Sequence, residues 1–140
     1  EESDQAALLK GIMTGKIHML ATDHAPHTLQ QKHRGAFGVP GLEVYGGVAA
    51  FLLDHGMSPV ALAKATSLHA AVRFSLGNKG RIAEGWQADF TILRMEERKV
   101  QPPYHTKCGW LPYDGMILPG WIPAVVRAGH VVLENGQFTH

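Results

Sequence analysis

The first part of the chain carries two different apolar patterns, one helical and one strand-like. Apolar residues recur at helical spacing after Ser3, a good N-cap, and before Gly15, so we predict an amphipathic helix over residues 4–14. The next run, residues 17–22, is short and mostly apolar without clean alternation, which is typical of a strand buried on both faces in a parallel sheet. Asp23 then lies at the carboxyl end of that predicted strand.

The middle of the chain is predicted to be a long loop followed by helices. Residues 24–41 have little periodicity and several prolines and glycines, so we expect one loop of about 18 residues, a length that is often functional in compact domains. Helical spacing returns over residues 42–55. Ser58-Pro59 is an N-cap followed by proline and predicts a helix that begins at Pro59. We expect Ser67 to cap a fourth, short helix that reaches about Leu76.

The last part of the chain changes to a β pattern. Residues 88–93 alternate enough for a strand with one covered face, whereas residues 96–120 are rich in proline, glycine and aromatic residues and are expected to be irregular. Two apolar runs within residues 122–133 flank Ala128-Gly129 and predict a β-hairpin, with another turn at Asn135-Gly136. The chain is therefore predicted to be an α/β protein with its helices first and a β segment afterwards.

The composition is that of an ordinary globular protein with one modest core: 140 residues, 45% hydrophobic and 18% charged. A net charge of +1 argues against nucleic acid or an anionic membrane as a partner, and the longest apolar runs are too short to span a bilayer. Cys108 is the only cysteine, which excludes an internal disulfide and favours a reducing, cytoplasmic location. The sequence begins with no signal-peptide pattern and no methionine, so we expect it to start partway through a longer protein.

Asp23-His24-Ala25-Pro26-His27 is the main candidate for chemistry. A carboxylate at the carboxyl end of a parallel barrel strand lies on the face where such barrels hold their active sites, and it can bind zinc or accept a proton from water. His27, held behind a proline, can contact an anionic group of a ligand.

Simpler roles for these residues stay open on spacing alone. Asp23 can form an Asx-type turn or a helix cap. His24 can be a hydrogen-bonding side chain, and His33, between Lys32 and Arg34, can be a solvated basic residue. His18 is expected to be buried with a partner within the predicted strand.

A longer motif surrounds the candidate residues: Ala21 to Thr28, then Lys32, then Gly38 to Glu43. It resembles the final barrel segment of dihydroorotases, which belong to the amidohydrolase superfamily of metal-dependent (β/α)8-barrel enzymes. Residues 80–90 resemble the point where such chains leave the barrel for a small β-domain. Residues 112–115 and 127–132 continue the likeness toward the C-terminus.

The resemblance implies a fold and a division into domains. The fold class is α/β, a C-terminal fragment of a (β/α)8 metal-dependent hydrolase barrel followed by part of a small β-sandwich domain. Residues 1–77 are expected to be the last βα portion of the barrel, and residues 78–140 the C-terminal part of the small β-domain. The partners expected from this likeness are the missing N-terminal barrel portion and further copies of the protein in a homo-oligomer.

The resemblance also implies site residues, a cofactor and a reaction. Asp23 matches an aspartate that binds the metal and shuttles a proton, His27 a histidine that contacts the substrate's carboxylate, and Gly38 a loop whose backbone contacts the substrate ring. The implied cofactor is zinc, two ions in a complete enzyme that interconverts N-carbamoyl-L-aspartate and dihydroorotate in pyrimidine biosynthesis. The family's other ligands include a His-x-His pair, which this sequence lacks, so they are expected upstream of Glu1 and the isolated chain is expected to be inactive.

Three other functions remain open at this point. The chain can belong to another cyclic amidohydrolase, such as a hydantoinase or allantoinase, which shares the aspartate and the β-domain. It can be a non-catalytic, dihydroorotase-like scaffold protein that has lost the upstream ligands. It can also be a self-contained metal-binding module that uses Asp23, His24, His27 and His33.

Overall fold

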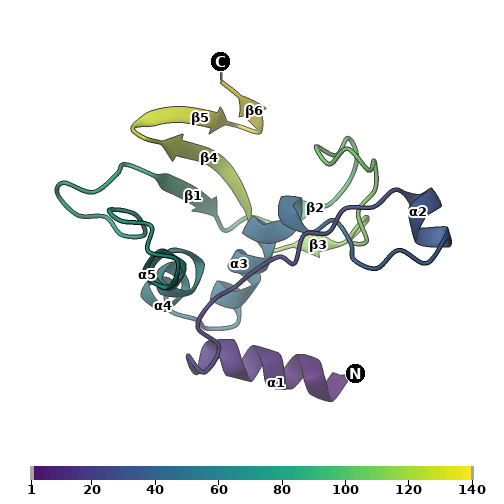
Figure 1. Ribbon diagram of the computed structural model, residues 1–140, viewed down its shortest axis with the longest axis horizontal. Helices are drawn as coiled ribbons and strands as arrows, with labels where there is room; N and C mark the ends of the chain where they lie inside the picture. The colour runs from purple at the N-terminus through teal and green to yellow at the C-terminus, as the bar shows by residue number, and fades with distance from the viewer. Residues whose placement is uncertain (1, 140) are drawn as a thin grey trace. The chain divides into compact units, whose positions relative to one another are not determined.

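The computed structural model describes residues 2–139, with the helices in the first part of the chain and the strands in the second (Figure 1). The helical elements are α1 (Glu2–Met13), α2 (Leu29–His33), η1 (Leu42–Val44), α3 (Tyr45–Asp54), α4 (Pro59–Ala63), η2 (Lys64–Leu68) and α5 (His69–Arg73). The strands are β1 (Phe90–Arg94), β2 (Arg98–Lys99), β3 (Ile117–Leu118), β4 (Trp121–Arg127), β5 (His130–Glu134) and β6 (Gln137–Phe138). None of the helices within residues 2–139 is long and apolar enough to cross a membrane.

The chain forms two compact units. Unit 1 contains Glu1–Ala21, Leu52–Ile92 and Ile122–His140, and unit 2 contains Thr22–Phe51 and Leu93–Trp121. The buried apolar residues of unit 1 include Ile12, Leu52, Met57, Leu62, Ala65 and Ala71, and those of unit 2 include Val44, Ala49, Ala50 and Leu111. Large apolar side chains also remain exposed in unit 1, such as Val72, Phe74 and Ile82.

Helix α1 confirms the first predicted helix, but it already includes Glu2, so Ser3 lies inside the helix and the prediction that it is the N-cap is wrong. Two acidic residues lie in its first turn and Lys10 lies in its last turn, which is the favourable arrangement for the helix dipole. Ile12 is its buried residue, and Gly15 follows the helix with a φ of +73°.

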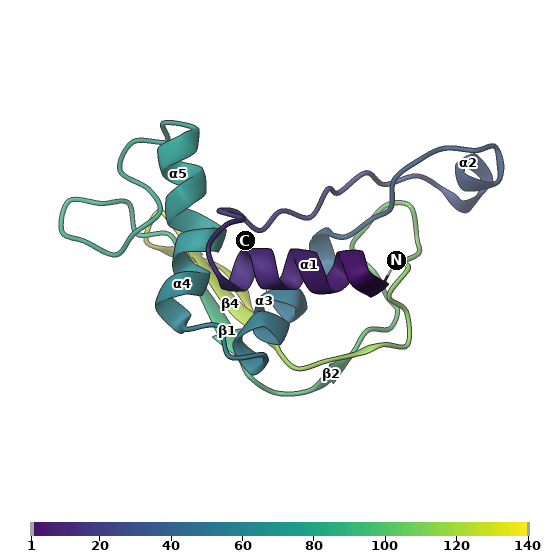
Figure 2. The same cartoon turned by 90° about the horizontal axis from the view of Figure 1, so that it is seen from below.

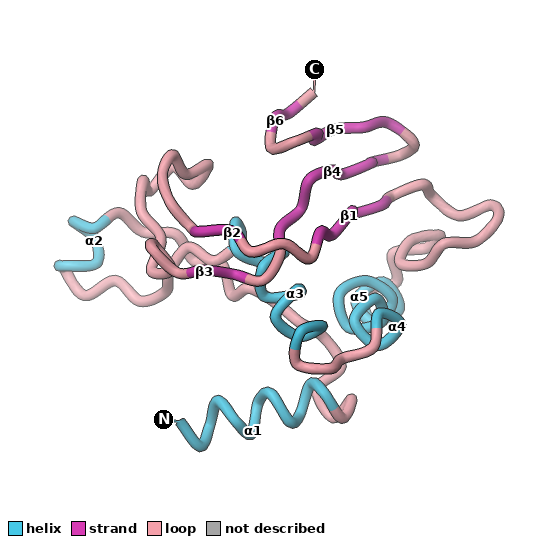
Figure 3. Tube along the Cα trace, turned by 180° about the vertical axis from the view of Figure 1, so that it is seen from behind, coloured by secondary structure: helices cyan, strands magenta, loops and turns pink. Residues whose placement is uncertain are grey.

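The strand predicted over residues 17–22 is wrong, because these residues belong to no helix or strand (Figure 3). Their partners are helical instead: the Leu20 N–H donates to the Ala65 carbonyl at 3.1 Å, and the His18 carbonyl lies 2.7 Å from Nδ1 of His69. A strand needs a neighbouring strand to complete its hydrogen-bond ladder, and a helix cannot supply one. His18 is also exposed rather than buried, with its ring packed edge-on against the His69 ring at 5.8 Å.

Helix α2 interrupts the region predicted to be one structureless loop, so that prediction is wrong over residues 29–33. The helix begins with a capping box: the Gln31 N–H donates to Oγ1 of Thr28 at 3.2 Å, and the Thr28 N–H donates to Oε1 of Gln31 at 2.9 Å. The Thr-x-x-Gln spacing is a local sequence signal for a helix start, and it identifies this turn in retrospect.

The later helices confirm two predictions and correct a third. Residues 42–54 form the helical run η1–α3, and Ser58 caps α4 by accepting the Ala61 N–H at 3.2 Å. Ser67 caps nothing, because it lies inside η2, a π-helical turn, and α4, η2 and α5 follow one another without a break (Figure 2). A cap requires the chain to leave helical geometry, but Ala63 and Leu68 both keep it. The run ends at Arg73 rather than near Leu76.

The strands confirm the predicted hairpin. The four-stranded sheet has the order β1-β4-β5-β6, and β4 pairs antiparallel with β5 from Ala124↔Glu134 to Arg127↔His130. Ala128 and Gly129 between them have φ values of +50° and +83°, which suit the tight turns of two-residue hairpins. Asn135 and Gly136 repeat this geometry before β6, with φ values of +51° and +80°.

The region predicted to be irregular contains one short pair of strands. Strands β2 and β3 pair antiparallel at Arg98↔Leu118 and Lys99↔Ile117, so the prediction is wrong for these four residues. The segment between them has no helix or strand. It contributes to the site described next.

Candidate functional site

Asp23 lies in a tight turn in unit 2 with an unusual backbone conformation. Its φ is +46°, in the left-handed region that L-residues other than asparagine and aspartate rarely adopt. The turn is closed by the preceding residue, because the His24 N–H donates to Oγ1 of Thr22 at 3.2 Å. The Asp23 side chain is exposed and its carboxylate makes no hydrogen bond within residues 2–139. The carboxylate therefore acts neither as an Asx-turn acceptor nor as a cap in this part of the chain.

Gly38 packs directly against the residue midway between Asp23 and His27. A Cβ on Gly38 would lie 2.4 Å from the Ala25 Cβ and 3.1 Å from the Ala25 carbonyl oxygen, and the φ of Gly38 is +95°. Close by, the Ala25 N–H donates to the Val39 carbonyl at 3.1 Å. The fold thus brings the predicted loop around Gly38, the glycine loop, against the Asp23–His27 segment, and only glycine fits at position 38.

Lys32 holds the tip of this glycine loop. Its Nζ donates to the Ala36 carbonyl at 2.7 Å and to the Gly38 carbonyl at 2.9 Å. The two carbonyls stand on either side of Phe37, whose side chain is 92% exposed. The sequence motif included Lys32 but did not predict this contact, because nothing local to Lys32 specifies which carbonyls it meets.

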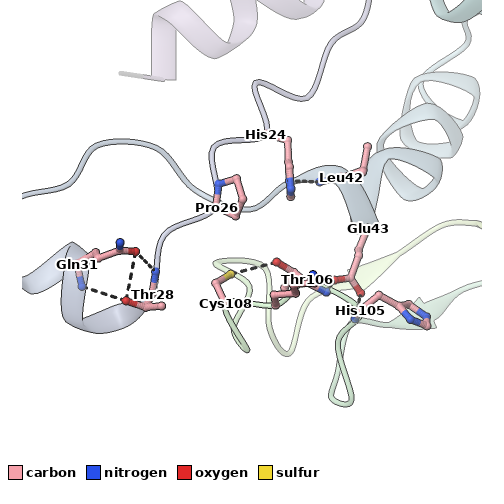
Figure 4. Close-up of a pocket in the computed structure, with 10 residues that line it drawn as sticks. His24, Pro26, Thr28, Gln31, Leu42, Glu43, His105, Thr106 and Cys108 are labelled. Atoms are coloured by element: carbon pink, nitrogen blue, oxygen red, sulfur yellow. Dashed lines mark hydrogen bonds between the residues drawn. The ribbon is translucent and has the colours of Figure 1, made fainter.

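His27 is half-buried, and its backbone carbonyl accepts a hydrogen bond from Nε1 of Trp110 at 2.7 Å. The alternate residues His24, Pro26 and Thr28 line a hollow of about 490 Å³ in unit 2 (Figure 4). Asp23, His27 and Gly38 are all absent from its lining.

A second segment of unit 2 forms the other wall of the hollow. The Glu43 carboxylate accepts the His105 N–H at 2.9 Å and the Thr106 N–H at 2.6 Å (Figure 4). Oγ1 of Thr106 lies 3.1 Å from Sγ of Cys108, the lone cysteine. Glu43 thus anchors a loop that sequence reasoning left unassigned, across 62 and 63 positions of sequence.

The same loop carries Tyr104, whose pKa is shifted further than that of any other described group in unit 2. The Tyr104 hydroxyl donates to Oδ1 of Asp114 at 2.5 Å. Partial burial, followed by this hydrogen bond and the negative charge of Asp114, raises the pKa of Tyr104 to about 12. Tyr104 is therefore a protonated donor at neutral pH and a structural tie rather than a base.

The described residues fit one ligand of a metal site and not a whole site. Catalytic zinc usually has three protein ligands, and within residues 2–139 no three His, Cys, Asp or Glu side chains are grouped to hold an ion. The self-contained module of four residues is not assembled, because Nδ1 of His24 is engaged by backbone N–H groups and His33 is exposed on α2. The Asp23 carboxylate, exposed and without a hydrogen-bond donor in that range, suits a ligand shared with groups from elsewhere.

Comparison with known proteins gives a consistent result across the chain. The model of the amidohydrolase family matches residues 1–132. The dihydroorotase of Pyrococcus abyssi is 34% identical over 140 residues, which cover 98% of this chain and 34% of that protein. The dihydroorotase of Thermococcus kodakarensis is 37% identical over 125 residues, covering 87% of this chain and 30% of that protein.

Solved structures share the fold over nearly the whole chain. A dihydropyrimidinase from Brevibacillus agri matches with a TM-score of 0.88 and 25% identity, covering 99% of this chain and 33% of that one. A D-hydantoinase from a Thermus species matches with a TM-score of 0.85 and 24% identity, covering 96% and 32%. The chain spans about a third of the length of all four of these proteins.

Proposed function

The chain belongs to the amidohydrolase family, and from this premise we propose that it is the C-terminal part of a dihydroorotase. The complete protein would interconvert N-carbamoyl-L-aspartate and dihydroorotate in pyrimidine biosynthesis, in the cytoplasm. The observation that carries the proposal is the 34% identity to a dihydroorotase along 98% of the chain, which includes the Asp23–His27 motif and the Gly38 loop.

The proposal includes an architecture for the complete protein. Residues 1–77 would be the last βα portion of a (β/α)8 barrel, and residues 78–140 part of a small β-domain. The N-terminal portion would supply the rest of the barrel and cover apolar surface of this part. The exposed apolar side chains of unit 1, such as Val72 at 69% and Phe74 at 64%, support a partner surface of this kind. We also expect the complete protein to be a homo-oligomer.

The proposed site assigns Asp23 to the metal and to proton transfer. A bound zinc ion supplies Lewis acidity and lowers the pKa of water from about 15.7 toward about 7. The Asp23 carboxylate would hold one position on zinc, accept the proton of the attacking water and deliver it to the departing ring nitrogen. Its exposure and its lack of a hydrogen-bond donor within residues 2–139 leave its oxygens available for both tasks.

His27 and Gly38 would orient the substrate. The imidazole of His27 would donate to the substrate's carboxylate, and the hydrogen bond from Trp110 to the His27 carbonyl at 2.7 Å fixes the backbone that carries it. The Gly38 backbone would contact the dihydropyrimidine ring. Its carbonyl already accepts from Lys32, and its packing on Ala25 keeps it beside the Asp23–His27 segment.

Steady-state kinetics of the full-length protein with three cyclic amides tests the proposal. Dihydroorotate should be hydrolysed with the highest kcat/KM, and hydantoin and allantoin much more slowly. A preference for hydantoin would reassign the protein to the hydantoinases, whose fold it shares. Absence of turnover with all three, in protein that retains zinc, would favour the non-catalytic scaffold.

A further inference from the structure

His24 makes a long-range contact in the site, and the proposed reaction gives it no task. Its ring nitrogen Nδ1 accepts the Gly41 N–H at 3.1 Å and the Leu42 N–H at 3.2 Å. These are the N–H groups of the N-cap and of the first residue of the helical run of residues 42–54, which lack partners inside the helix. Gly41 is the N-cap and offers no side chain of its own, so His24 supplies the capping acceptor from 17 positions away.

The two donors determine the protonation of the ring. A backbone N–H can only donate, so Nδ1 must present its lone pair and the proton of the neutral ring must be on Nε2. One lone pair is shared between two donors in a three-centre arrangement, which an amide oxygen in the same place can also form.

This contact constrains the backbone at Asp23, because the residues on both sides of Asp23 contact Gly41. Before Asp23, the Thr22 carbonyl oxygen lies 3.2 Å from where a Cβ on Gly41 would be. After Asp23, the His24 ring accepts the Gly41 N–H. Asp23 stands between these two contacts with a φ of +46°, a left-handed conformation that aspartate tolerates better than most L-residues and that the contacts on both sides hold in place.

We propose that His24 is a positioning residue, whose bond to the helix start at Gly41 and Leu42 holds Asp23 in its left-handed conformation and so aims the Asp23 carboxylate. This inference rests on the proposed function, because it gives the aim of the carboxylate a purpose. Without the ring acceptor, the turn is free to relax to a negative φ at Asp23, which changes the direction of the Asp23 carboxylate.

Two variants of the full-length protein separate the acceptor from the bulk of the ring. In His24→Asn, the amide oxygen can occupy nearly the position of Nδ1 and accept the same N–H groups, whereas His24→Leu fills the space without an acceptor. Residues that orient a metal ligand typically change activity or metal affinity by about 10- to 100-fold when mutated. We expect His24→Leu to lower kcat for dihydroorotate by about that factor with little change in KM, and His24→Asn to recover most of it. His33→Leu, the same change at an exposed histidine on α2, is the matched control and should keep the wild-type kcat.

Two further readouts do not depend on turnover. The ¹⁵N NMR spectrum of the His24 ring should show an unprotonated Nδ1, and zinc analysis should find metal lost from His24→Leu but retained in His24→Asn. A wild-type kcat in His24→Leu, equal losses in both variants, or a proton on Nδ1 would each overturn the proposal. If the wild-type protein hydrolyses no cyclic amide, the proposed function fails by itself. The role of His24 is then decided by zinc retention, and equal zinc in all variants would refute it.

Discussion

Replacing Gly38 with alanine tests whether the glycine loop is held against the Asp23–His27 segment by close packing. The new Cβ would lie 2.4 Å from the Ala25 Cβ, a separation that real Cβ atoms essentially never show, and 3.1 Å from the Ala25 carbonyl oxygen. The φ of +95° is also unfavourable for alanine. Both effects destabilise the loop, but they can be separated, because Gly35 in the same loop has a φ of +90° with nothing within 4 Å of its added Cβ.

The two costs have different sizes. A left-handed backbone costs an L-residue about 1–2 kcal/mol, and Gly35→Ala incurs only this. Overpacking a filled site costs about 1–3 kcal/mol more, so we expect Gly38→Ala to lose about 2–5 kcal/mol in total. In the double variant Ala25→Gly/Gly38→Ala, the shorter of the two contacts is absent. Most of the overpacking cost should then be absent, so the double variant should lose less stability than the sum of the losses in Gly38→Ala and Ala25→Gly.

Urea unfolding of the full-length variants, followed by tryptophan fluorescence, measures these differences. Trp110 is a suitable reporter because its indole donates to the His27 carbonyl in the same unit. If Gly38→Ala is destabilised no more than Gly35→Ala, or if Ala25→Gly gives no recovery, the close packing does not hold the loop. Close packing on Ala25 would then not be what places Gly38 in the site.

Four further predictions concern the site and the loop around it. Asp23→Asn should abolish turnover and leave the melting temperature nearly unchanged, because the carboxylate makes no hydrogen bond within residues 2–139; a full rate in this variant would refute the proton-transfer role. His27→Ala should raise KM for dihydroorotate strongly, and a change in melting temperature alone would contradict its proposed contact with the substrate. Glu43→Gln should lower the free energy of unfolding by about 1 kcal/mol, since the amide has one acceptor oxygen for two N–H donors. An unchanged urea midpoint would mean that this anchor contributes nothing to stability. The raised pKa of Tyr104, about 12 against 10.0 in the unfolded chain, means that the stability it contributes is complete below pH 10.0 and is lost as the pH rises toward 12. An ultraviolet titration against Tyr104→Phe should show this phenolate forming late, and its appearance near pH 10 would refute the tie to Asp114.

Local sequence was sufficient for several elements whose stabilising contacts lie within a few residues of each other. Helix α1, the helical run of residues 42–54 and the Ser58 cap follow from apolar spacing and from polar groups three or four positions apart. The hairpin turn at Ala128-Gly129 follows from the two apolar runs that flank it and from Gly129, which adopts a positive φ without steric cost. The Thr28–Gln31 capping box belongs to the same class, although it was missed within a loop rich in other punctuation.

Only the tertiary structure decided what the candidate site residues contact. Residues 17–22 have a strand-like pattern, yet a strand forms only beside another strand, and here their hydrogen bonds go to helical residues. The acceptor role of His24, the packing of Gly38 on Ala25 and the anchor made by Glu43 join positions between 13 and 63 residues apart. The residue types in the sequence determined which groups can bind a metal, accept a proton or turn the chain. Which atoms they meet depends on the path of the backbone between them, because a hydrogen bond or a packing contact exists only when folding brings both partners within a few ångströms.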